Sequence, residues 1–198
     1  MSREGAIESA SRYFDEGKFR DDLARRVAFK TESQIPESWP NLAAYLEGEI
    51  GPAFERMGYG VRIVPNPTMG GPFLIATRIE DPSLPTVLGY GHADVVRGLE
   101  PQWRRGLDPW VLTVEGERWY GRGTADNKAQ HLINMLALEE VITERGRLGF
   151  NSKFLIETGE EIGSPGLREI CAQEKEALAA DLLIGSDGPR LTPSRPTV

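Results

Sequence analysis

The chain has 198 residues, of which 39% are hydrophobic and 27% are charged, as in ordinary soluble globular proteins. At roughly 150 residues per domain, this is one domain with enough chain to bury a core. The net charge of −7 argues against nucleic acid or an anionic membrane as the main partner. Cys171 is the only cysteine, which excludes an internal disulfide and a multi-cysteine zinc site. No apolar run has the length of a membrane span or the position of a signal peptide, so we expect a cytoplasmic protein.

Two helices are predicted in the first 60 residues. Apolar residues recur at helical spacing among charges over residues 1–30, as on an amphipathic surface helix. After a polar stretch that contains prolines, a second helix is predicted over Asn41–Met57, with a kink at Gly51-Pro52. Either Gly58 or Gly60 would supply its left-handed C-terminal cap.

Three strands and a hairpin are predicted next. Short apolar runs, each bounded by Pro, Gly or Asp, predict strands at Val61–Val64, Phe73–Ile79 and Thr86–Tyr90. The third run is typical of a strand buried on both faces of a sheet. A hairpin is predicted around the turn Glu115-Gly116-Glu117.

The second half of the chain alternates helix and strand. A helix is predicted over Lys128–Arg145, with Ile133 among its inner residues, followed by a strand at Lys153–Glu157. A further helix is predicted over Leu167–Ala179 and a final buried strand over Leu182–Gly185. This alternation predicts an α/β fold: a three-layer sandwich with a largely parallel, mixed sheet and helices on both faces.

Four clusters of side chains that can bind metals follow predicted strands or open a helix. They are Gly91–Asp94, Gly121–Lys128, Glu157–Gly163 and Gly185–Gly188. Ligands of open α/β sheets gather at the carboxyl ends of the strands. Imidazole suits zinc, and carboxylates also suit harder ions such as manganese. The clusters therefore predict a hydrolytic centre in which two ions about 3.5–4 Å apart hold a water between them.

The residue types suggest a role for each cluster. Asp126, on a glycine-containing loop before a helix, is the best candidate to bridge two ions, and His92 would bind one of them. Asp94 would point the same way as His92 and accept its other ring N–H. Since the side chains of Glu160 and Glu161 diverge, one can bind metal while the other acts as general base. The alternatives are a structural role for His92 and solvation of both glutamates.

These stretches resemble the two-metal amidohydrolases that include acetylornithine deacetylase, carboxypeptidase G and the carnosinase-like dipeptidases. The resemblance rests on four motifs in the family's order and spacing, over about the last 110 residues. They are Tyr90–Asp94, Tyr120–Lys128, Glu157–Leu167 and Ser186-Asp187. The resemblance implies that His92 and Asp187 hold one zinc ion, that Glu161 holds the other, and that Asp126 bridges them; Asp187 could otherwise merely cap a turn.

The same resemblance implies two ions per site, with Mn²⁺ or Co²⁺ as alternatives to Zn²⁺. It implies that Glu160 is the general base, that Asp94 orients His92, and that the peptide bond between Asp126 and Asn127 is cis, which is rare without proline.

The predicted function is hydrolysis of a peptide or amide bond by a metal-activated water, of the dipeptidase or aminopeptidase type. In the family, Asp at the position of Asp187 tends to accompany dipeptidases and aminopeptidases, and the stretch Glu160–Leu167 resembles the dipeptidase branch. Two alternatives remain. One is an N-acyl amino acid deacylase of the acetylornithine or succinyl-diaminopimelate type, and the other is a non-catalytic, truncated product. The expected substrate is a small peptide or an N-acyl amino acid.

The chain departs from the family in its length. We expect residues 1–190 to be the N-terminal part of a catalytic domain and residues 191–198 to begin the connection to an absent lid or dimerisation domain, through which the intact protein could form a homodimer. In the family a final histidine beyond the lid completes the second metal site. His131 lies inside a predicted helix and does not replace it, so we expect the isolated chain to be inactive.

Overall fold

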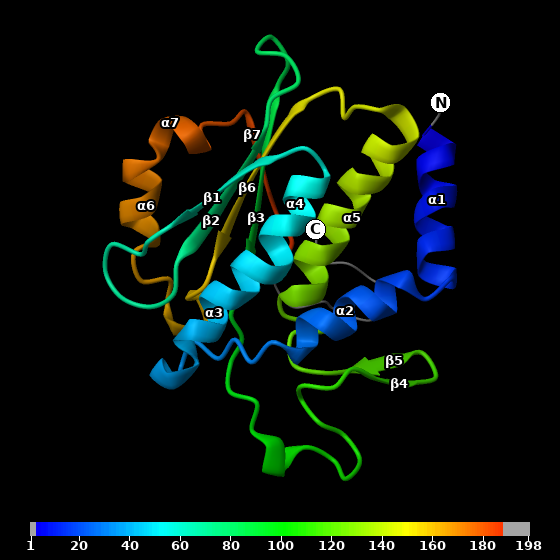
Figure 1. The fold of residues 1–198 in the computed structure, drawn as a ribbon, viewed down its shortest axis with the longest axis vertical. Helices are drawn as coiled ribbons and strands as arrows, with labels where there is room; N and C mark the ends of the chain where they lie inside the picture. The colour runs from blue at the N-terminus through cyan, green and yellow to red at the C-terminus, as the bar shows by residue number, and fades with distance from the viewer. Residues whose placement is uncertain (1–2, 188–198) are drawn as a thin grey trace.

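A mixed five-stranded sheet forms the centre of the computed structural model, which describes residues 3–187 (Figure 1). β1 (Gly60–Val64) pairs antiparallel with β2 (Phe73–Arg78), and β2 pairs antiparallel with β6 (Asn151–Glu157). β6 runs parallel to β3 (Thr86–His92), and β3 runs parallel to β7 (Leu182–Gly185). The carboxyl ends of β6, β3 and β7 therefore lie at the same edge of the sheet, next to one another.

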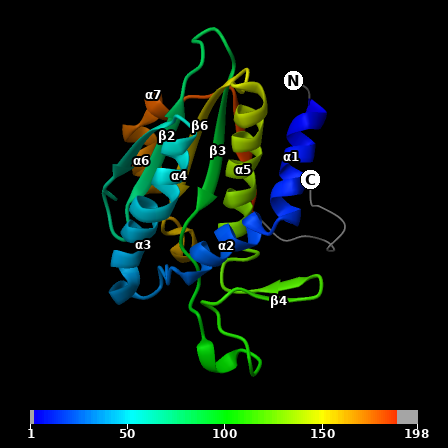
Figure 2. The same ribbon diagram turned by 45° about the vertical axis from the view of Figure 1, so that its right-hand side comes forward.

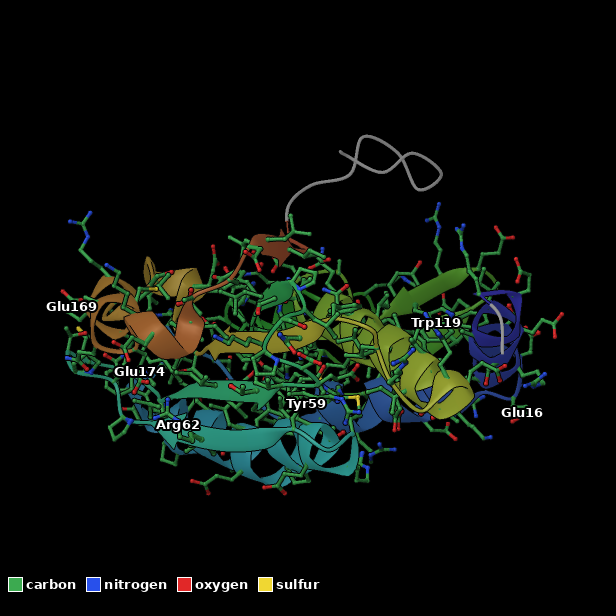
Figure 3. All side chains as sticks on the ribbon, turned by 90° about the horizontal axis from the view of Figure 1, so that it is seen from above. Glu16, Tyr59, Arg62, Trp119, Glu169 and Glu174 are labelled. Carbon is green, nitrogen blue, oxygen red and sulfur yellow. The ribbon has the colours of Figure 1, made fainter. Side chains whose placement is uncertain are left out.

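Helices cover both faces of this sheet. The α-helices are α1 (Arg3–Asp15), α2 (Lys18–Ala28), α3 (Trp39–Tyr45), α4 (Gly51–Arg56), α5 (Lys128–Arg145), α6 (Leu167–Gln173) and α7 (Lys175–Leu178). Short helical turns are η1 (Pro36–Ser38), η2 (Leu46–Ile50), η3 (Glu100–Gln102) and η4 (Glu160–Ile162). Seen from above, α3 and α4 lie on one side of the sheet, and α6 and α7 lie on the other (Figure 3).

Two apolar clusters bind the layers together. On one face, residues of α3, η2, α4 and α5 pack on the sheet; this cluster includes Tyr45, Phe54, Leu74, Met135 and Phe154. On the other face, α6 and α7 pack on β2 and β6; this cluster includes Phe73, Ile75, Leu155, Ile170 and Leu178. Strand side chains alternate between the two faces, so β2 and β6 each contribute to both clusters. The predicted three-layer α/β sandwich is confirmed.

Most predicted elements are present, with two changes in the N-terminal helices. The helix predicted over residues 1–30 is divided into α1 and α2 by Gly17, which has a φ of 79°. The helix predicted over Asn41–Met57 continues through Gly51-Pro52, but η2 is a π-helical segment. Because Pro52 has no N–H, the regular helical hydrogen bond cannot form there. Gly58, at a φ of 78°, ends the helix as predicted.

The burial predicted for β7 is wrong. Leu182, Leu183 and Ile184 are 54%, 65% and 46% exposed, because β7 is the edge strand and pairs with β3 alone among the described residues. β3 is likewise only partly buried over its first three residues. Ile133, predicted on the inner side of α5, is 48% exposed. The spacing of apolar residues shows which face of a helix is apolar, but it does not show how much of that face other elements cover.

A small two-stranded hairpin lies apart from the five-stranded sheet. The hairpin consists of β4 (Thr113–Glu115) and β5 (Arg118–Tyr120), joined at the predicted turn, and it lies beyond the carboxyl end of β3 (Figure 2). The predicted connection at residues 191–198 lies outside the described residues. Among the residues that are described, no helix has the length and apolar character needed to cross a membrane.

Candidate metal centre

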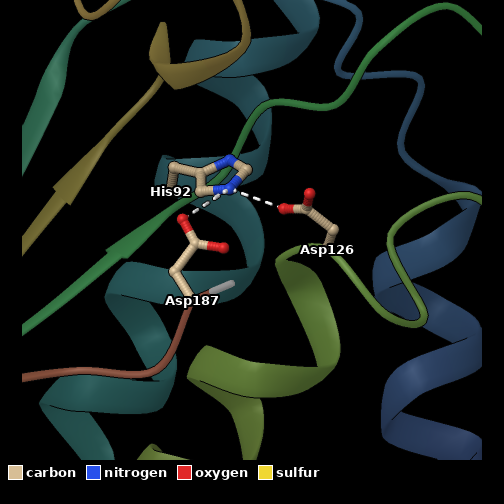
Figure 4. Close-up of side chains that lie close together, drawn as sticks. All are labelled: His92, Asp126 and Asp187. Carbon is tan, nitrogen blue, oxygen red and sulfur yellow. Dashed lines mark hydrogen bonds and ion pairs between the residues drawn. The ribbon is translucent and has the colours of Figure 1, made fainter. Parts of the chain in front are cut away.

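His92 is the last residue of β3, and its side chain is fully buried. Its Nε2 lies 2.8 Å from Oδ1 of Asp126 and 3.6 Å from Oδ2 of Asp187 (Figure 4). Its Nδ1 lies 3.1 Å from the backbone carbonyl of Asp94 and 3.3 Å from the Asp94 carboxylate. The predicted contact between Asp94 and the second ring nitrogen is therefore present, and the carbonyl of Asp94 shares it. Each nitrogen of the imidazole faces oxygen atoms.

Charge complementarity dominates this group. Burial by itself lowers the pKa of His92, but hydrogen bonds and charge interactions with Asp126 and Asp94 outweigh it and raise the pKa to about 10. The hydrogen bond from His92 is also the main cause that lowers the pKa of Asp126, whose side chain is half-exposed. The carboxylates gathered here favour a positive charge between them, which either a proton or a divalent cation can supply.

Asp126 reaches the centre from the loop that precedes α5. The peptide bond between Asp126 and Asn127 is cis, as predicted. Immediately after it, Lys128 is fully buried, and its Nζ donates hydrogen bonds of 2.9 and 2.6 Å to the backbone carbonyls of Arg26 and Phe29. The start of α5 is thus tied to the end of α2, which fixes the direction from which Asp126 approaches His92.

Glu160 and Glu161 lie in η4, just after the carboxyl end of β6. Their backbone N–H groups donate 3.1 Å hydrogen bonds to the two carboxylate oxygens of Asp94. Burial is the largest cause that raises the pKa of both carboxyl groups; the negative charge of Asp126 adds to it. One residue, Asp94, therefore contacts both the imidazole of His92 and the turn that carries the two glutamates.

His92, Asp126 and Asp187 form the one group of three or more potential ligands that the described part of the chain brings together. One ligand atom from each lies within 4.8 Å of the others. One imidazole nitrogen and two carboxylate oxygens fit a divalent zinc-type cation. Glu160, Glu161 and Asp94 are not members of this group.

The sequence does not indicate the structural roles of several residues near the centre. The side chain of Asn127 accepts a hydrogen bond from the backbone N–H of His92 and donates one to the carbonyl of Ser186, the residue before Asp187. Glu157, buried at the end of β6, accepts hydrogen bonds from Tyr90 (2.5 Å) and Ser164 (3.0 Å), which ties the turn after β6 to β3. Asn127 and Glu157 lie inside recognised motifs, but nothing in their spacing indicates the partners that folding gives them. His131, for which a position on the helix surface and a packing role were both open, is buried against Tyr45.

Residues 88–195 match the family described as peptidase family M20/M25/M40. A beta-Ala-His dipeptidase of Mus musculus is 30% identical over an alignment that covers 98% of this chain and 42% of the relative. The crystal structure of human carnosine dipeptidase 1 matches with a TM-score of 0.85 and 29% identity, over 93% of this chain and 41% of that one. Dug1p, a Saccharomyces cerevisiae dipeptidase, shares the fold with a TM-score of 0.82 and 21% identity, over 95% of this chain and 41% of Dug1p.

The chain therefore spans about two fifths of the length of these relatives. Its match to the family covers more than half of its own residues and includes all four motifs on which the resemblance was based. The predicted resemblance is confirmed: this chain belongs to peptidase family M20/M25/M40.

Proposed function

We propose that the protein containing this chain is a metal-dependent peptidase that hydrolyses short peptides, of the dipeptidase type. The observation that supports this most directly is the convergence of His92, Asp126 and Asp187 at the edge of the sheet, with Glu160 and Glu161 on the adjoining turn. The similarity to a beta-Ala-His dipeptidase over nearly the whole chain favours a dipeptide over an N-acyl amino acid as substrate.

In this proposal, His92 and Asp187 would hold one divalent ion, Glu161 would hold a second, and Asp126 would contribute to both. Zinc suits this set of donors, and Mn²⁺ and Co²⁺ are the alternatives. When bound, such ions would acidify a water molecule and polarise the substrate carbonyl. The sequence holds two histidines, and the second, His131, has its Nε2 3.2 Å from the hydroxyl of Tyr45, so this chain offers the second ion Asp126 and Glu161.

Glu160 would serve as the general base. It would take a proton from the attacking water and later deliver it to the nitrogen that leaves. Asp94 would keep Glu160 in place through the backbone of the turn and keep the ring of His92 oriented. A cytoplasmic location and dimerisation through a lid remain predictions.

The test compares two substitutions in the full-length protein. Glu160→Gln should lower the turnover of dipeptides by about 10²- to 10⁴-fold and leave the metal content unchanged. His92→Ala should instead deplete the metal. Glu176→Gln, at an exposed position on α7, is the control. Full turnover in Glu160→Gln would show that the base is another residue.

A panel of dipeptides and N-acetyl amino acids separates the two substrate classes. We expect dipeptides to be cleaved faster. A preference for N-acetyl amino acids would support the deacylase alternative. If the metal-loaded full-length protein cleaves neither class, the hydrolase proposal fails and a non-catalytic role is favoured.

A further inference from the structure

We infer that Asn127 is the positioning residue that holds the three candidate ligands of the first ion in their relative places. The inference rests on the proposed metal centre. Asn127 is joined to Asp126 by the cis peptide bond. Its Oδ1 accepts a hydrogen bond of 3.3 Å from the backbone N–H of His92, and its Nδ2 donates one of 2.8 Å to the carbonyl of Ser186, the residue before Asp187. The buried side-chain amide of Asn127 thus contacts the backbone of two ligand segments, and its own backbone is bonded to the third ligand, Asp126.

The amide group is well suited to this task. It carries an acceptor at one end and a donor at the other, whereas a carboxylate only accepts. The side chain of His131 is fully buried beside Asn127. A neutral ring can accept from the hydroxyl of Tyr45 at Nε2 (3.2 Å) and donate from Nδ1 to Oδ1 of Asn127 (3.4 Å). Gln130 accepts from Nδ2 at 2.6 Å. Each end of the Asn127 amide therefore faces groups of the opposite hydrogen-bonding type.

Gly91 allows Asn127 and His131 to lie close to the backbone of β3. A Cβ atom at Gly91 would lie 2.9 Å from Cβ of His131 and 3.1 Å from Oδ1 of Asn127. Any side chain there would push the start of α5 away from β3. The close contact between β3 and α5 at this point is therefore a requirement of the site, and it explains a glycine directly before His92.

The segment of Asp187 lies beyond the end of the β3–β7 pairing. The last residue of β7 in register with β3 is Gly185, opposite Tyr90, so Ser186 and Asp187 lie beyond the ladder. Asn134 binds the hydroxyl of Ser186 at 2.9 Å, and Asn127 binds its carbonyl. Hydrogen bonds from two asparagines of the α5 region, Asn127 and Asn134, thus hold Ser186 where the strand pairing has ended. The hydrogen bond from Asn127 is the one that binds the backbone of this segment.

The experiment measures metal affinity. The full-length protein is titrated with Zn²⁺ against a competing chelator and with Co²⁺ while its visible absorption is followed. Asn127→Leu, which removes the hydrogen bonds with His92 and Ser186 at similar volume, should weaken binding about 10- to 100-fold and change the Co²⁺ spectrum. Gly91→Ala should act in the same direction.

Asn151→Leu is the matched control. Asn151 is also a buried asparagine whose amide bridges backbone groups, but it lies at the opposite end of β6. It should lower the melting temperature and leave the metal affinity and the Co²⁺ spectrum unchanged. Circular dichroism of the metal-free variants checks the fold.

Asn127→Asp keeps the proposal testable if Asn127→Leu does not fold. It retains the acceptor for His92 and loses the donor for Ser186. Its added negative charge would by itself attract a cation, so weaker binding would be due to the lost hydrogen bond. If the unmodified chain binds neither ion, the proposed metal centre fails, and this inference with it. If the unmodified chain binds and the Asn127 variants match it in affinity and spectrum, only this inference is overturned.

Discussion

The backbone N–H of Glu160 donates a 3.1 Å hydrogen bond to the carboxylate of Asp94, a residue 66 positions earlier in the chain. The neighbouring N–H of Glu161 binds the other oxygen of the same carboxylate. Asp94 is fully buried, and it also lies 3.3 Å from Nδ1 of His92. It therefore couples the imidazole to the turn that carries both glutamates, and changes at Asp94 should affect both.

Asp94→Asn should disturb both contacts, because the new amide places an N–H₂ group opposite a backbone N–H. We expect faster hydrogen exchange at the amides of Glu160 and Glu161 and about tenfold or more weaker zinc binding. Asp81→Asn is the control, since Asp81 also accepts a backbone N–H, from Ser83, at an exposed turn. Unchanged exchange at both glutamates would contradict the coupling.

Zinc should stabilise the folded chain, because the folded chain gathers ligands that the unfolded chain keeps apart. At a free zinc concentration of one hundred times Kd, the free energy of unfolding should rise by about 2.7 kcal/mol, and chelator should reverse the change. His92→Ala should abolish the effect. The measurement is the melting temperature with and without zinc. If zinc shifts the melting temperature of His92→Ala as much as that of the unmodified chain, zinc binds at another place.

Tyr59 should contribute to a fall in stability above about pH 10. Burial is the main cause that raises the pKa of this phenol to about 12, and its hydroxyl donates a 2.7 Å hydrogen bond to Ser152. A phenol that keeps its proton more tightly when folded stabilises the protein fully below the unfolded pKa of about 10 and loses this contribution as the pH rises toward 12. Tyr59→Phe should flatten the pH dependence of urea unfolding in this range. A Tyr59 that ionises near pH 10 in the folded protein, followed by tyrosinate absorption, would refute this.

Leucines on β6 and β7 should differ sharply in their importance for stability. Leu155→Ala, in the cluster beneath α6 and α7, should cost about 2–5 kcal/mol. Leu183→Ala, on the exposed edge strand, should change the free energy of unfolding by about 0.5 kcal/mol or less. Urea unfolding of the two variants gives both values. A large loss in Leu183→Ala would mean that β7 is covered in solution.

The sequence by itself determined which elements form and which motifs end at the site. Periodicity and turn residues are local, so α5, β7 and the β4–β5 hairpin lie where they were predicted, and the motifs around His92 and Asp126 were sufficient to indicate the family. The same local signals gave the wrong burial for β7 and Ile133, because burial depends on which distant elements pack against a surface.

Only the tertiary structure decided how the site is held together. The hydrogen bond that Asn127 accepts from His92 and the one that it donates to Ser186 span 35 and 59 positions. The two that Asp94 accepts from Glu160 and Glu161 span 66 and 67 positions. An asparagine or aspartate acquires such a role through the backbone groups that folding brings within about 3 Å of it, and no spacing in the chain encodes that proximity.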